Sequence, residues 1–527
     1  MQAPRPGAAV RQVVIVGGGS AGWLTAGLIA ADHATTASAR EGEPRLQVTL
    51  LEAPGIPPIG VGEGTWPSMR DTLRRIGLRE ADLVRGADAS FKQGSRFIGW
   101  ADGSRGDQYH HPFVLPQGHG DADLVSAWLS RHPARAFAEL VSYQPHLCDR
   151  GLAPKQPGTP EYAAVANYGY HFDAGKFGVL LRAHCIAQLG VHHVLDEVVA
   201  VRSHDNGDIA ALETRAHGAL AGDLFIDCTG LPSLLLGRHY GVPLVSQRHV
   251  LFNDRALAVP VPYAQPDHPI ASQTLATAQR GGWVWDIGLP TRRGVGHVYS
   301  SAHTSDDEAE AALRAYLGPA GQRADLPAPR QLRFEPGYRA RFWHRNCVAV
   351  GLSAGFIEPL EASALALVEM SAAMISAQLP ADRDEMDTVA RDFNEAFGYR
   401  WQRVIDFLKL HYVLTRRTET DYWRDHVRDE SVPERLRELL RLWRHRPPSR
   451  LDFPRIDEVF PSASWQYVLY GMGFRPDPAG STRRREDPAL AEGFFREAAG
   501  LAARMLPALP DNRALIAHVQ RHGLSTI

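Results

Sequence analysis

Residues 12 to 27 read QVVIVGGGSAGWLTAG, and the expected fold is built around these residues. The β-branched run before the glycines is typical of a short, buried parallel strand. Gly17, Gly19 and Gly22 then give the spacing G-x-G-x-x-G, and small residues that can open a helix follow. The first glycine allows a tight turn, the second lets the backbone approach a pyrophosphate, and the third lets helix and strand pack closely. Because a helix N-terminus offers N–H donors to an anion, we expect a dinucleotide site here rather than a plain turn.

The next strand is expected over Leu46 to Leu51, and it ends at an acidic residue, Glu52. A carboxylate at the end of this strand can accept hydrogen bonds from a ribose diol. Glu52 lies 30 positions beyond Gly22, whereas such an acid usually follows after about 20. The polar segment from Asp32 to Arg45 accounts for the excess. We therefore interpret Glu52 as a ribose ligand, with a plain surface acid as the alternative.

Length and composition limit the class of protein. A chain of 527 residues is too long for one core and predicts about two to four compact units. Hydrophobic residues make up 44% and charged residues 22%, as in an ordinary globular enzyme. The net charge of -2 gives no field that would recruit nucleic acid or an anionic membrane. No run of 18 apolar residues and no N-terminal apolar core occur, so we expect neither a spanning helix nor a signal peptide.

Cysteine and histidine spacing indicates neither disulfides nor a metal. The cysteines are scattered without a C-x-x-C pair, which favours a reducing, cytoplasmic location over a disulfide framework. They are Cys148, Cys185, Cys228 and Cys347. The paired histidines of YHHPF, Tyr109 to Phe113, point apart in a strand and lack a third ligand at a usual spacing. We therefore expect no metal.

Three later stretches combine strands with turns of small residues. Pro57 to Pro67, PPIGVGEGTWP, is equally a plain turn or a loop lying close to a ligand. Ala221 to Gly230, AGDLFIDCTG, is a strand that ends where the backbone can approach a cofactor. Asn346 to Ser371 predicts a strand, a loop with Gly351 and a helix that starts near Glu361. That helix N-terminus suits an anion or a flavin carbonyl, while Glu361 is equally a structural acid of the first turn.

Two further segments carry side chains that suit an enclosed site. Ser90 to Trp100, SFKQGSRFIGW, alternates and carries Lys92 among aromatics. Such a lysine is usually a solvated strand residue, but in an apolar enclosure it becomes a hydrogen-bond donor or a tunable nucleophile. The segment GGWVWDIGLP places Trp283, Trp285 and Ile287 on one side of a strand. The two tryptophans are either core packing or a rigid apolar wall that excludes water.

Taken in order, these motifs resemble those of the flavin-dependent tryptophan halogenases over nearly the whole chain. The matching motifs are the glycine run at Gly17, Gly60 to Thr65, Phe91-Lys92, Asp227-Cys228-Thr229-Gly230, W-x-W-x-I, and Gly351 to Ser363. The glycine motif is shared by many flavoproteins, whereas W-x-W-x-I together with F-K is specific. The resemblance implies a mixed α/β fold. It consists of a flavin-monooxygenase-like FAD-binding module with an inserted substrate sheet over residues 10–380, and a mostly helical subdomain over 381–527 that covers the substrate site.

The resemblance implies FADH2-dependent halogenation of an indole-type aromatic. In such enzymes reduced FAD and dioxygen form a hydroperoxide that chloride or bromide attacks, and the resulting hypohalous acid travels to the substrate. Lys92 matches the lysine that presents the electrophilic halogen, and Glu361 matches a glutamate near the substrate. His111 and Phe113 resemble the pair that sandwiches the indole, with Trp465 as the opposite wall.

The same resemblance supplies the expected ligands of the halide and the cofactor. Ser363 and Ala364 match positions whose backbone N–H groups hold halide. The residues expected to bind FAD are Gly17, Gly18, Gly19, Ser20, Ala21, Gly22, Glu52, Val198, Asp227, Gly351, Leu352 and Leu365.

The sequence departs from the family pattern at two places. Ile287 is followed by Gly288-Leu289-Pro290 rather than directly by proline. Glu361 is followed by Ala362-Ser363-Ala364 rather than by Ser-Thr-Gly or Ser-Thr-Ser. Backbone donors survive such changes, while halide preference and pocket shape stay open. Tryptophan, free indole and a larger indole-bearing molecule all remain candidate substrates.

Two other functions remain as alternatives. A flavin-dependent aromatic monooxygenase (hydroxylase) shares the FAD module, but such enzymes usually carry Gly-Asp where this chain has Gly351-Leu352, and they lack W-x-W-x-I. A non-catalytic flavin-binding protein would not need both Lys92 and Glu361. Nothing in the sequence resembles an NADPH site, so we expect a separate flavin reductase that supplies FADH2. Besides this reductase and a small aromatic substrate we expect no nucleic acid and no membrane, and a homodimer stays open.

Overall fold

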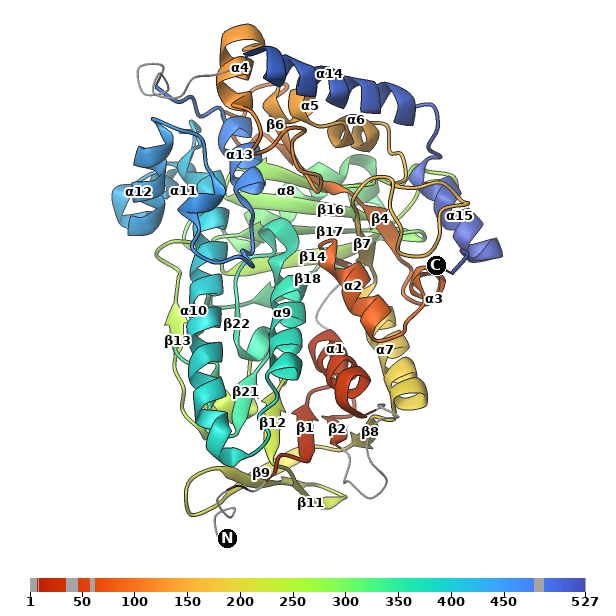
Figure 1. The fold of residues 1–527 in the computed structure, drawn as a ribbon, viewed down its shortest axis with the longest axis vertical. Coiled ribbons are helices and arrows are strands. Elements are labelled where there is room, and N and C mark those ends of the chain that lie inside the picture. The colour runs from red at the N-terminus through yellow and green to blue at the C-terminus, as the bar shows by residue number, and fades with distance from the viewer. Residues whose placement is uncertain (1–6, 8, 35–45, 57–61, 478–487, 527) are drawn as a thin grey trace. The chain divides into compact units, whose positions relative to one another are not determined.

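The computed structural model describes residues 7, 9–34, 46–56, 62–477 and 488–526 (Figure 1). Residues 57–61 of the glycine loop and 35–45 of the polar segment lie outside the described residues. The chain divides into two compact units, each built from three stretches. Unit 1 comprises Met1–Asp88, Phe172–Gln247 and Phe334–Trp401, and unit 2 comprises Ala89–His171, Arg248–Arg333 and Gln402–Ile527. This division differs from the single boundary expected near residue 380, because the chain passes repeatedly from one unit to the other.

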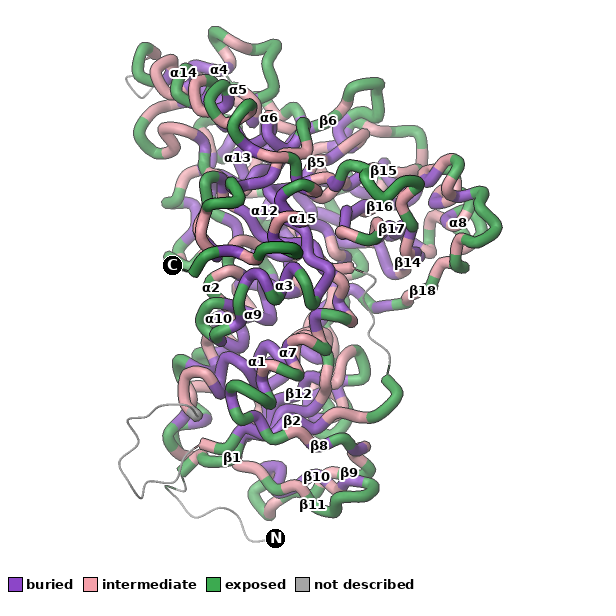
Figure 2. Tube along the Cα trace, turned by 90° about the vertical axis from the view of Figure 1, so that its right-hand side faces the viewer, coloured by how far each residue is buried: buried purple, intermediate pink, exposed green. Residues whose placement is uncertain are grey.

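Unit 1 is built on a six-stranded sheet with β1 in its interior. In spatial order the strands are β20 (Trp343–His344), β21 (Cys347–Ala349), β12 (Leu224–Asp227), β1 (Gln12–Val16), β2 (Gln47–Glu52) and β8 (His192–Leu195). All neighbours run parallel except β20 and β21. Val13, Val14 and Ile15 are at most 1% exposed, and Figure 2 shows β1, β2 and β12 buried. Burial on both faces explains the unbroken apolar runs, and the strands predicted for this sheet are confirmed.

Three helices of unit 1 pack together: α1 (Ser20–Ile29), α7 (Ala174–Leu189) and α9 (Ser363–Ala377). Asp173 caps α7 by accepting from the Lys176 N–H, and Gly190, with φ of 68°, ends it. The stretch Leu360–Ala377 is long and apolar enough to cross a membrane by length and composition alone. In the structure 67% of it is buried inside the protein, so it packs as a core helix.

Smaller elements complete unit 1. An antiparallel hairpin is formed by β9 (Val198–Ser203) and β10 (Ile209–Thr214), and β11 (Gly218–Ala221) extends it. A second small sheet contains β13 (Leu244–Ser246), β19 (Gly337–Arg339) and β22 (Gly355–Phe356). The remaining elements are η1 (Ala30–Ala34), β3 (Glu63–Gly64), α2 (Ser68–Arg75), α3 (Glu80–Gly86), η2 (Leu234–His239), η4 (Gly351–Ser353) and η5 (Leu360–Ala362).

Unit 2 contains a seven-stranded, mostly antiparallel sheet. Its order is β18 (Arg330–Arg333), β14 (Arg255–Pro262), β17 (Arg292–Tyr299), β16 (Gly282–Gly288), β15 (Thr274–Gln279), β5 (Gly94–Ile98) and β6 (Gln108–Pro112). Only β15 and β5 run parallel. Helix α8 (Asp306–Leu317) starts in a capping box of Ser305 and Glu308, and its Leu313 joins a core cluster with Val259 and Val295 of the sheet. Separately, β4 (Ser90–Lys92) pairs with β7 (Gly169–Phe172).

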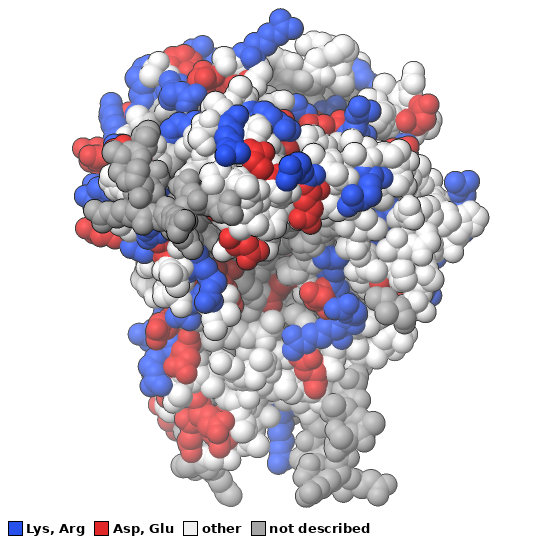
Figure 3. Space-filling model, turned by 45° about the horizontal axis from the view of Figure 1, so that its top comes forward, with Lys and Arg blue, Asp and Glu red and all other residues white. Residues whose placement is uncertain are grey.

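The C-terminal part of the chain is helical. Helix α10 (Arg383–Val413) begins in unit 1 and ends in unit 2. In unit 2 the other helices are α4 (Leu124–Arg131), α5 (Phe137–Val141), α6 (Gln144–Asp149), α11 (Asp421–His426), α12 (Glu434–Trp443), α13 (Ser462–Gly471), α14 (Pro488–Met505) and α15 (Asn512–His522), with short turns η3 (Gly318–Gln322), η6 (Asp429–Ser431) and η7 (Arg450–Asp452). All four cysteines are buried and free. On the face drawn in Figure 3, acidic and basic side chains are interspersed.

Candidate functional site

The turn between β1 and α1 forms a cradle with room for an anion. A Cβ at Gly17, where φ is 118°, would lie 2.2 Å from the Cys228 carbonyl oxygen, and one at Gly22 would lie 1.9 Å from that of Gly17. Around Gly19, by contrast, no described atom outside its own short stretch of chain lies within 4 Å of such a Cβ. Gly19 is the N-cap of α1, which has no side-chain cap and no acid in its first turn. The N–H groups and the positive end of α1 therefore border open space, as a phosphate site requires.

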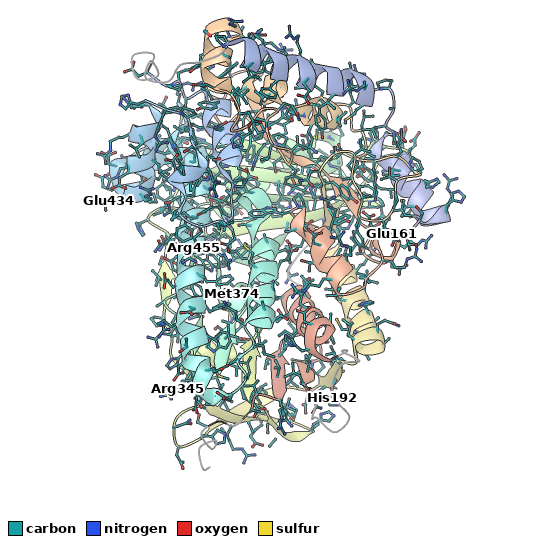
Figure 4. All side chains as sticks on the ribbon, in the orientation of Figure 1. Glu161, His192, Arg345, Met374, Glu434 and Arg455 are labelled. Atoms are coloured by element: carbon teal, nitrogen blue, oxygen red, sulfur yellow. The ribbon has the colours of Figure 1, made fainter. Side chains whose placement is uncertain are left out.

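Glu52 lies beside this cradle, and a histidine that the sequence did not indicate holds it. A Cβ at Gly18 would lie 2.2 Å from the carboxyl carbon of Glu52, so the two residues are in close contact. His193 Nε2 donates to Glu52 Oε2 at 3.0 Å, from the strand next to β2; its neighbour His192 is labelled in Figure 4. One oxygen of Glu52 is thereby oriented by the protein. This arrangement leaves a carboxylate at the place where a ribose diol is bound in dinucleotide folds.

The other residues expected to bind FAD lie on several elements of unit 1. A Cβ at Gly351 would lie 2.8 Å from the Cβ of Ala21, so the loop after β21 approaches the first turn of α1. Leu352 follows in η4, and Leu365 is buried in α9. Val198 begins β9. Ser20 is the first residue of α1.

Asp227 shapes the loop that follows β12. Its buried carboxylate accepts from the Thr229 N–H and hydroxyl at 3.0 and 2.6 Å, and from the N–H groups of Leu235 and Leu236, both at 2.9 Å. These hydrogen bonds hold the Asp-Cys-Thr-Gly turn in place under the cradle, where the Cys228 carbonyl meets Gly17. Asp227 thus acts on the shape of the cradle through backbone groups.

The turn before α9 differs from the expected one. Glu361 has φ and ψ of 65° and 7°, and Ala362 has 55° and 40°, so both are left-handed. Left-handed residues cannot belong to a right-handed helix, and α9 therefore begins at Ser363 rather than near Glu361. Glu361 is not an acid of the first helical turn, which removes that structural interpretation. A left-handed residue followed by a right-handed one points consecutive N–H groups into a concavity that suits anions. At the start of α9 these are the N–H groups of Ser363 and Ala364.

Lys92 is 1% exposed, so the interpretation as a solvated strand residue is wrong. It ends β4, and its Nζ lies 5.3 Å from the centroid of the Phe113 ring. The structure thus brings together two of the residues expected at the substrate. A lysine enclosed in this way acts as a hydrogen-bond donor or, when neutral, as a nucleophile.

His171 is a neighbour of Lys92 that the sequence did not indicate. In the β4–β7 ladder Ser90 lies opposite His171 and Lys92 opposite Gly169, so Lys92 and His171 are diagonal neighbours on one face. His171 is fully buried, and its Nε2 hydrogen-bonds to the Thr274 hydroxyl at 2.8 Å. Burial and the positive charge of Lys92 hold the pKa of His171 well below its usual value. The imidazole is therefore neutral beside Lys92.

His111 and Trp465 lie in one aromatic cluster of unit 2. His111, on β6, hydrogen-bonds through Nε2 to the Ser464 hydroxyl at 2.9 Å. Phe407 lies between the two residues, with ring centroids 5.7 Å from His111 and 5.0 Å from Trp465. Trp465 is 1% exposed and donates its indole N–H to the Phe460 carbonyl at 3.1 Å. His111 is thus oriented from helix α13, which also carries Trp465.

The W-x-W-x-I segment is β16, as predicted, with Trp283 and Ile287 buried and Trp285 half-buried. The residues that stand between Ile287 and Pro290, where the family has proline directly after isoleucine, make a contact of their own. The carbonyl of Gly288 accepts from the Ser90 hydroxyl at 2.5 Å, two residues before Lys92. Gly288, the first of these residues, therefore connects β16 by a hydrogen bond to β4, the strand that carries Lys92.

A cluster that could hold a metal involves His110, the first of the paired histidines. Ligand atoms of His110, Glu139 and Asp149 lie within 4.8 Å of one another, so folding supplies the partners that sequence spacing lacked. His110 Nε2 is 3.0 Å from Asp149 Oδ1, and Arg96 lies 3.4 Å from the same oxygen. The guanidinium already compensates the carboxylate, which favours an ion-pair network over a cation site.

Each unit therefore holds part of the expected site. Unit 1 carries the cradle, Glu361 and the N-terminus of α9, and unit 2 carries Lys92 with His111, Phe113 and Trp465. A largely parallel sheet with an anion cradle at its first helix and a carboxylate at the end of β2 defines the class as a dinucleotide-binding α/β protein.

Comparison with known proteins narrows this class to a family. The family model described as "Tryptophan halogenase" matches residues 12–487, and the chain belongs to this family. The chain is 34% identical to the tryptophan 6-halogenase SttH of Streptomyces toxytricini, covering 95% of this chain and 96% of that one. The crystal structure of a tryptophan halogenase from Shewanella frigidimarina NCIMB 400 superposes with a TM-score of 0.94 at 49% identity, covering 99% of both chains. BrvH, a flavin-dependent halogenase from Brevundimonas sp. BAL3, superposes with a TM-score of 0.83 at 34% identity, covering 97% and 99%.

The expected fold class and family are thereby confirmed. The chain is a flavin-dependent halogenase, and the hydroxylase alternative is set aside. The cradle fits a flavin dinucleotide, because Gly19 borders open space at the end of an uncapped helix and Glu52 stands beside it.

Proposed function

We propose that this halogenase uses FADH2, dioxygen and chloride or bromide to halogenate an indole-type aromatic, namely tryptophan, free indole or a larger indole. The observation that carries the proposal is a buried lysine, Lys92, beside the Phe113 ring in a chain of this family. An amine hidden from water can hold a diffusible oxidant close to a substrate, whereas a solvated one would release it.

In this proposal the cradle holds the cofactor through the first turn of α1 and through Glu52, which His193 orients. Bound as FADH2, the cofactor supplies the reaction with dioxygen that oxidises halide to hypohalous acid. The N–H groups of Ser363 and Ala364 at the start of α9 hold the halide, because they lie at the positive end of a helix without a side-chain cap.

Lys92 keeps the hypohalous acid local in one of two ways. As an ammonium it donates a hydrogen bond to the oxygen and makes the halogen more electrophilic. As a neutral amine it attacks the halogen, so that an N–halogen bond forms, the O–halogen bond breaks, and the amine proton leaves with the hydroxide as water. The neutral His171 adds no second positive charge on this face of the ladder.

Glu361 orients the halogen or stabilises the cationic ring formed when an aromatic carbon attacks it. His111 and Phe113 position the aromatic ring, supported by Trp465 within the same cluster.

A separate flavin reductase delivers FADH2 to the enzyme. Turnover of purified protein with NADPH and FAD alone would contradict this part.

Product mass after incubation with a flavin reductase, NADH, FAD, dioxygen, bromide and a panel of indoles tests the proposal. We expect a product with the bromine isotope pattern, and we expect it to be lost in Lys92→Met, which removes the amine but keeps an unbranched side chain. Lys155→Met is the matched control, because Lys155 is also fully buried and its Nζ lies 5.8 Å from the Phe91 ring centroid. A hydroxylated product, or halogenation that survives in Lys92→Met, would refute the proposal.

A further inference from the structure

Trp66 contacts the unusual turn at Glu361 directly. It follows the glycine loop and stands two residues before α2. Its indole Nε1 donates to the backbone carbonyl of Glu361 at 2.7 Å, a distance that indicates a well-formed hydrogen bond. Both residues belong to unit 1.

The backbone that receives this hydrogen bond needs support. Glu361 and Ala362 are consecutive non-glycine residues with positive φ, a conformation that is energetically unfavourable for residues with a Cβ. Such residues persist where surrounding contacts hold them. The Ala362 N–H donates to the Pro359 carbonyl at 3.0 Å within the turn, while Trp66 supplies a contact from outside it. The direction of the Glu361 side chain and of the first N–H groups of α9 follows from this turn.

A second contact fixes the helix behind Trp66 against α9. The hydroxyls of Thr72 and Ser68, on α2, donate to the two carboxyl oxygens of Glu369 on α9 at 2.6 and 3.2 Å. Glu369 is 4% exposed, and burial raises its pKa to about 8. A neutral buried group with hydroxyl partners on both oxygens holds α2 in register with α9. Helix α2, held against α9 in this way, therefore fixes the position of Trp66 beside Glu361.

We propose that Trp66 is a positioning residue for the halogenase: its indole N–H holds the left-handed turn at Glu361 and Ala362, and so aims the Glu361 carboxylate and the N–H groups of Ser363 and Ala364. The inference rests on the proposed function for the roles of those groups. A plain aromatic ring at position 66 would fill the same space but leave the turn without its external donor.

The test removes the indole N–H of Trp66 and separates this loss from a change in ring size. Trp66→Phe is compared with replacement of Trp66 by 3-benzothienylalanine, which keeps the bicyclic shape and carries sulfur in place of the N–H, and with Trp66→His, which retains a ring donor. The matched control is Trp343→Phe, because Trp343 donates its indole N–H to the Arg345 carbonyl at 3.0 Å elsewhere in unit 1. The readouts are kcat and KM for bromination and the bromide Kd of the FAD-loaded protein, followed by flavin fluorescence.

In Trp66→Phe and in the benzothienyl variant, which lack the donor, kcat should fall about three- to tenfold and the bromide Kd should rise by about the same factor. The KM for the indole should change little. Trp66→His should recover part of the loss, and Trp343→Phe should stay within about twofold of wild type. Wild-type kcat and bromide affinity in the benzothienyl variant, or an equal loss in Trp343→Phe, would overturn the inference. If wild type binds bromide but makes no halogenated product, the proposed function fails while the bromide Kd still decides the role of Trp66. A wild type that binds no bromide overturns both.

Discussion

The buried Lys92 and the half-buried Glu52 show how single charged residues depend on neighbours from other strands. Moving a cation out of water is costly, and a second cation nearby would add to that cost. Beside Lys92 the protein places a histidine that stays neutral, because burial and the lysine itself lower its pKa. Beside Glu52 it places His193, which donates to the carboxylate. In both cases a histidine from another strand is compatible with the charge of its neighbour, being neutral beside the lysine and donating a hydrogen bond to the carboxylate.

At this scale we predict that Glu52→Gln weakens FAD binding about tenfold or more, because a charged acceptor for a sugar hydroxyl is replaced by a neutral one. Flavin fluorescence titration of the purified protein measures the Kd. Glu213→Gln is the control, since Glu213 pairs with Arg202 in the β9–β10 hairpin of the same unit. Equal FAD affinity of Glu52→Gln and wild type would show that Glu52 is a plain surface acid.

At the scale of elements, the contact between α2 and α9 decides where the start of α9 lies. Helix α9 packs in the core of unit 1 against α1, and α2 meets it through Ser68 and Thr72. Trp66, just before α2, contacts Glu361 in the turn just before α9. The Glu369 carboxyl at the centre of this contact is a buried acid rather than an apolar group. Its protonation therefore links the packing of the two helices to pH.

We predict a pH-dependent effect of Glu369→Gln on stability. Burial raises the pKa of Glu369 to about 8 from an ordinary value of 4.5. Between these values the folded protein holds a proton that the unfolded chain has lost, so the free energy of unfolding falls as the pH rises. The glutamine variant lacks this fall, and its Tm relative to wild type should rise by roughly 2–4 °C between pH 5 and pH 8.

Differential scanning calorimetry across this range measures the effect, with Glu310→Gln as a control from a surface ion pair on α8. A constant Tm difference between Glu369→Gln and wild type at all pH values would contradict a raised pKa at this position.

At the scale of the whole molecule, the chain does not divide where its helical C-terminal part begins. The longer, N-terminal part of α10 completes unit 1, with Phe393 and Phe397 almost fully buried against Trp343 and Phe342. The remaining part belongs to unit 2. The continuous helix α10 therefore contributes residues to both compact units.

We predict that a fragment of residues 1–380 does not fold, because unit 1 loses the aromatic side chains that α10 supplies. Removing a single buried phenylalanine side chain typically costs about 3–5 kcal/mol, and domains are stable by only about 5–15 kcal/mol. Circular dichroism melting and FAD titration of the fragment, beside the full chain, test this. A cooperative melt with FAD binding by the fragment would instead support an independent module ending near residue 380.

The parts of the fold and site that were predictable share a local cause. Strands β1, β2 and β16 follow from apolar runs, alternation and turn residues within a few positions. The start of α9 was predicted two residues early, near Glu361, because the left-handed turn before it is held partly by Trp66 from 295 positions away. The boundary at residue 380 was expected from the family resemblance, whereas each compact unit of the structure is built from three stretches of the chain, and α10 runs from one unit into the other.

The glycine turn, the acid that ends β2 and the order of motifs that marks the family could be predicted from the amino-acid sequence, because each depends on residues close together in the chain. The burial of Lys92, and the contact by which His193, 141 positions beyond Glu52, orients its carboxylate, became visible only in the folded structure. Only it brought Trp66 to the carbonyl of Glu361. The physical reason is that burial and long-range hydrogen bonds arise when whole elements pack together, and no local pattern records which strand or helix the neighbour comes from.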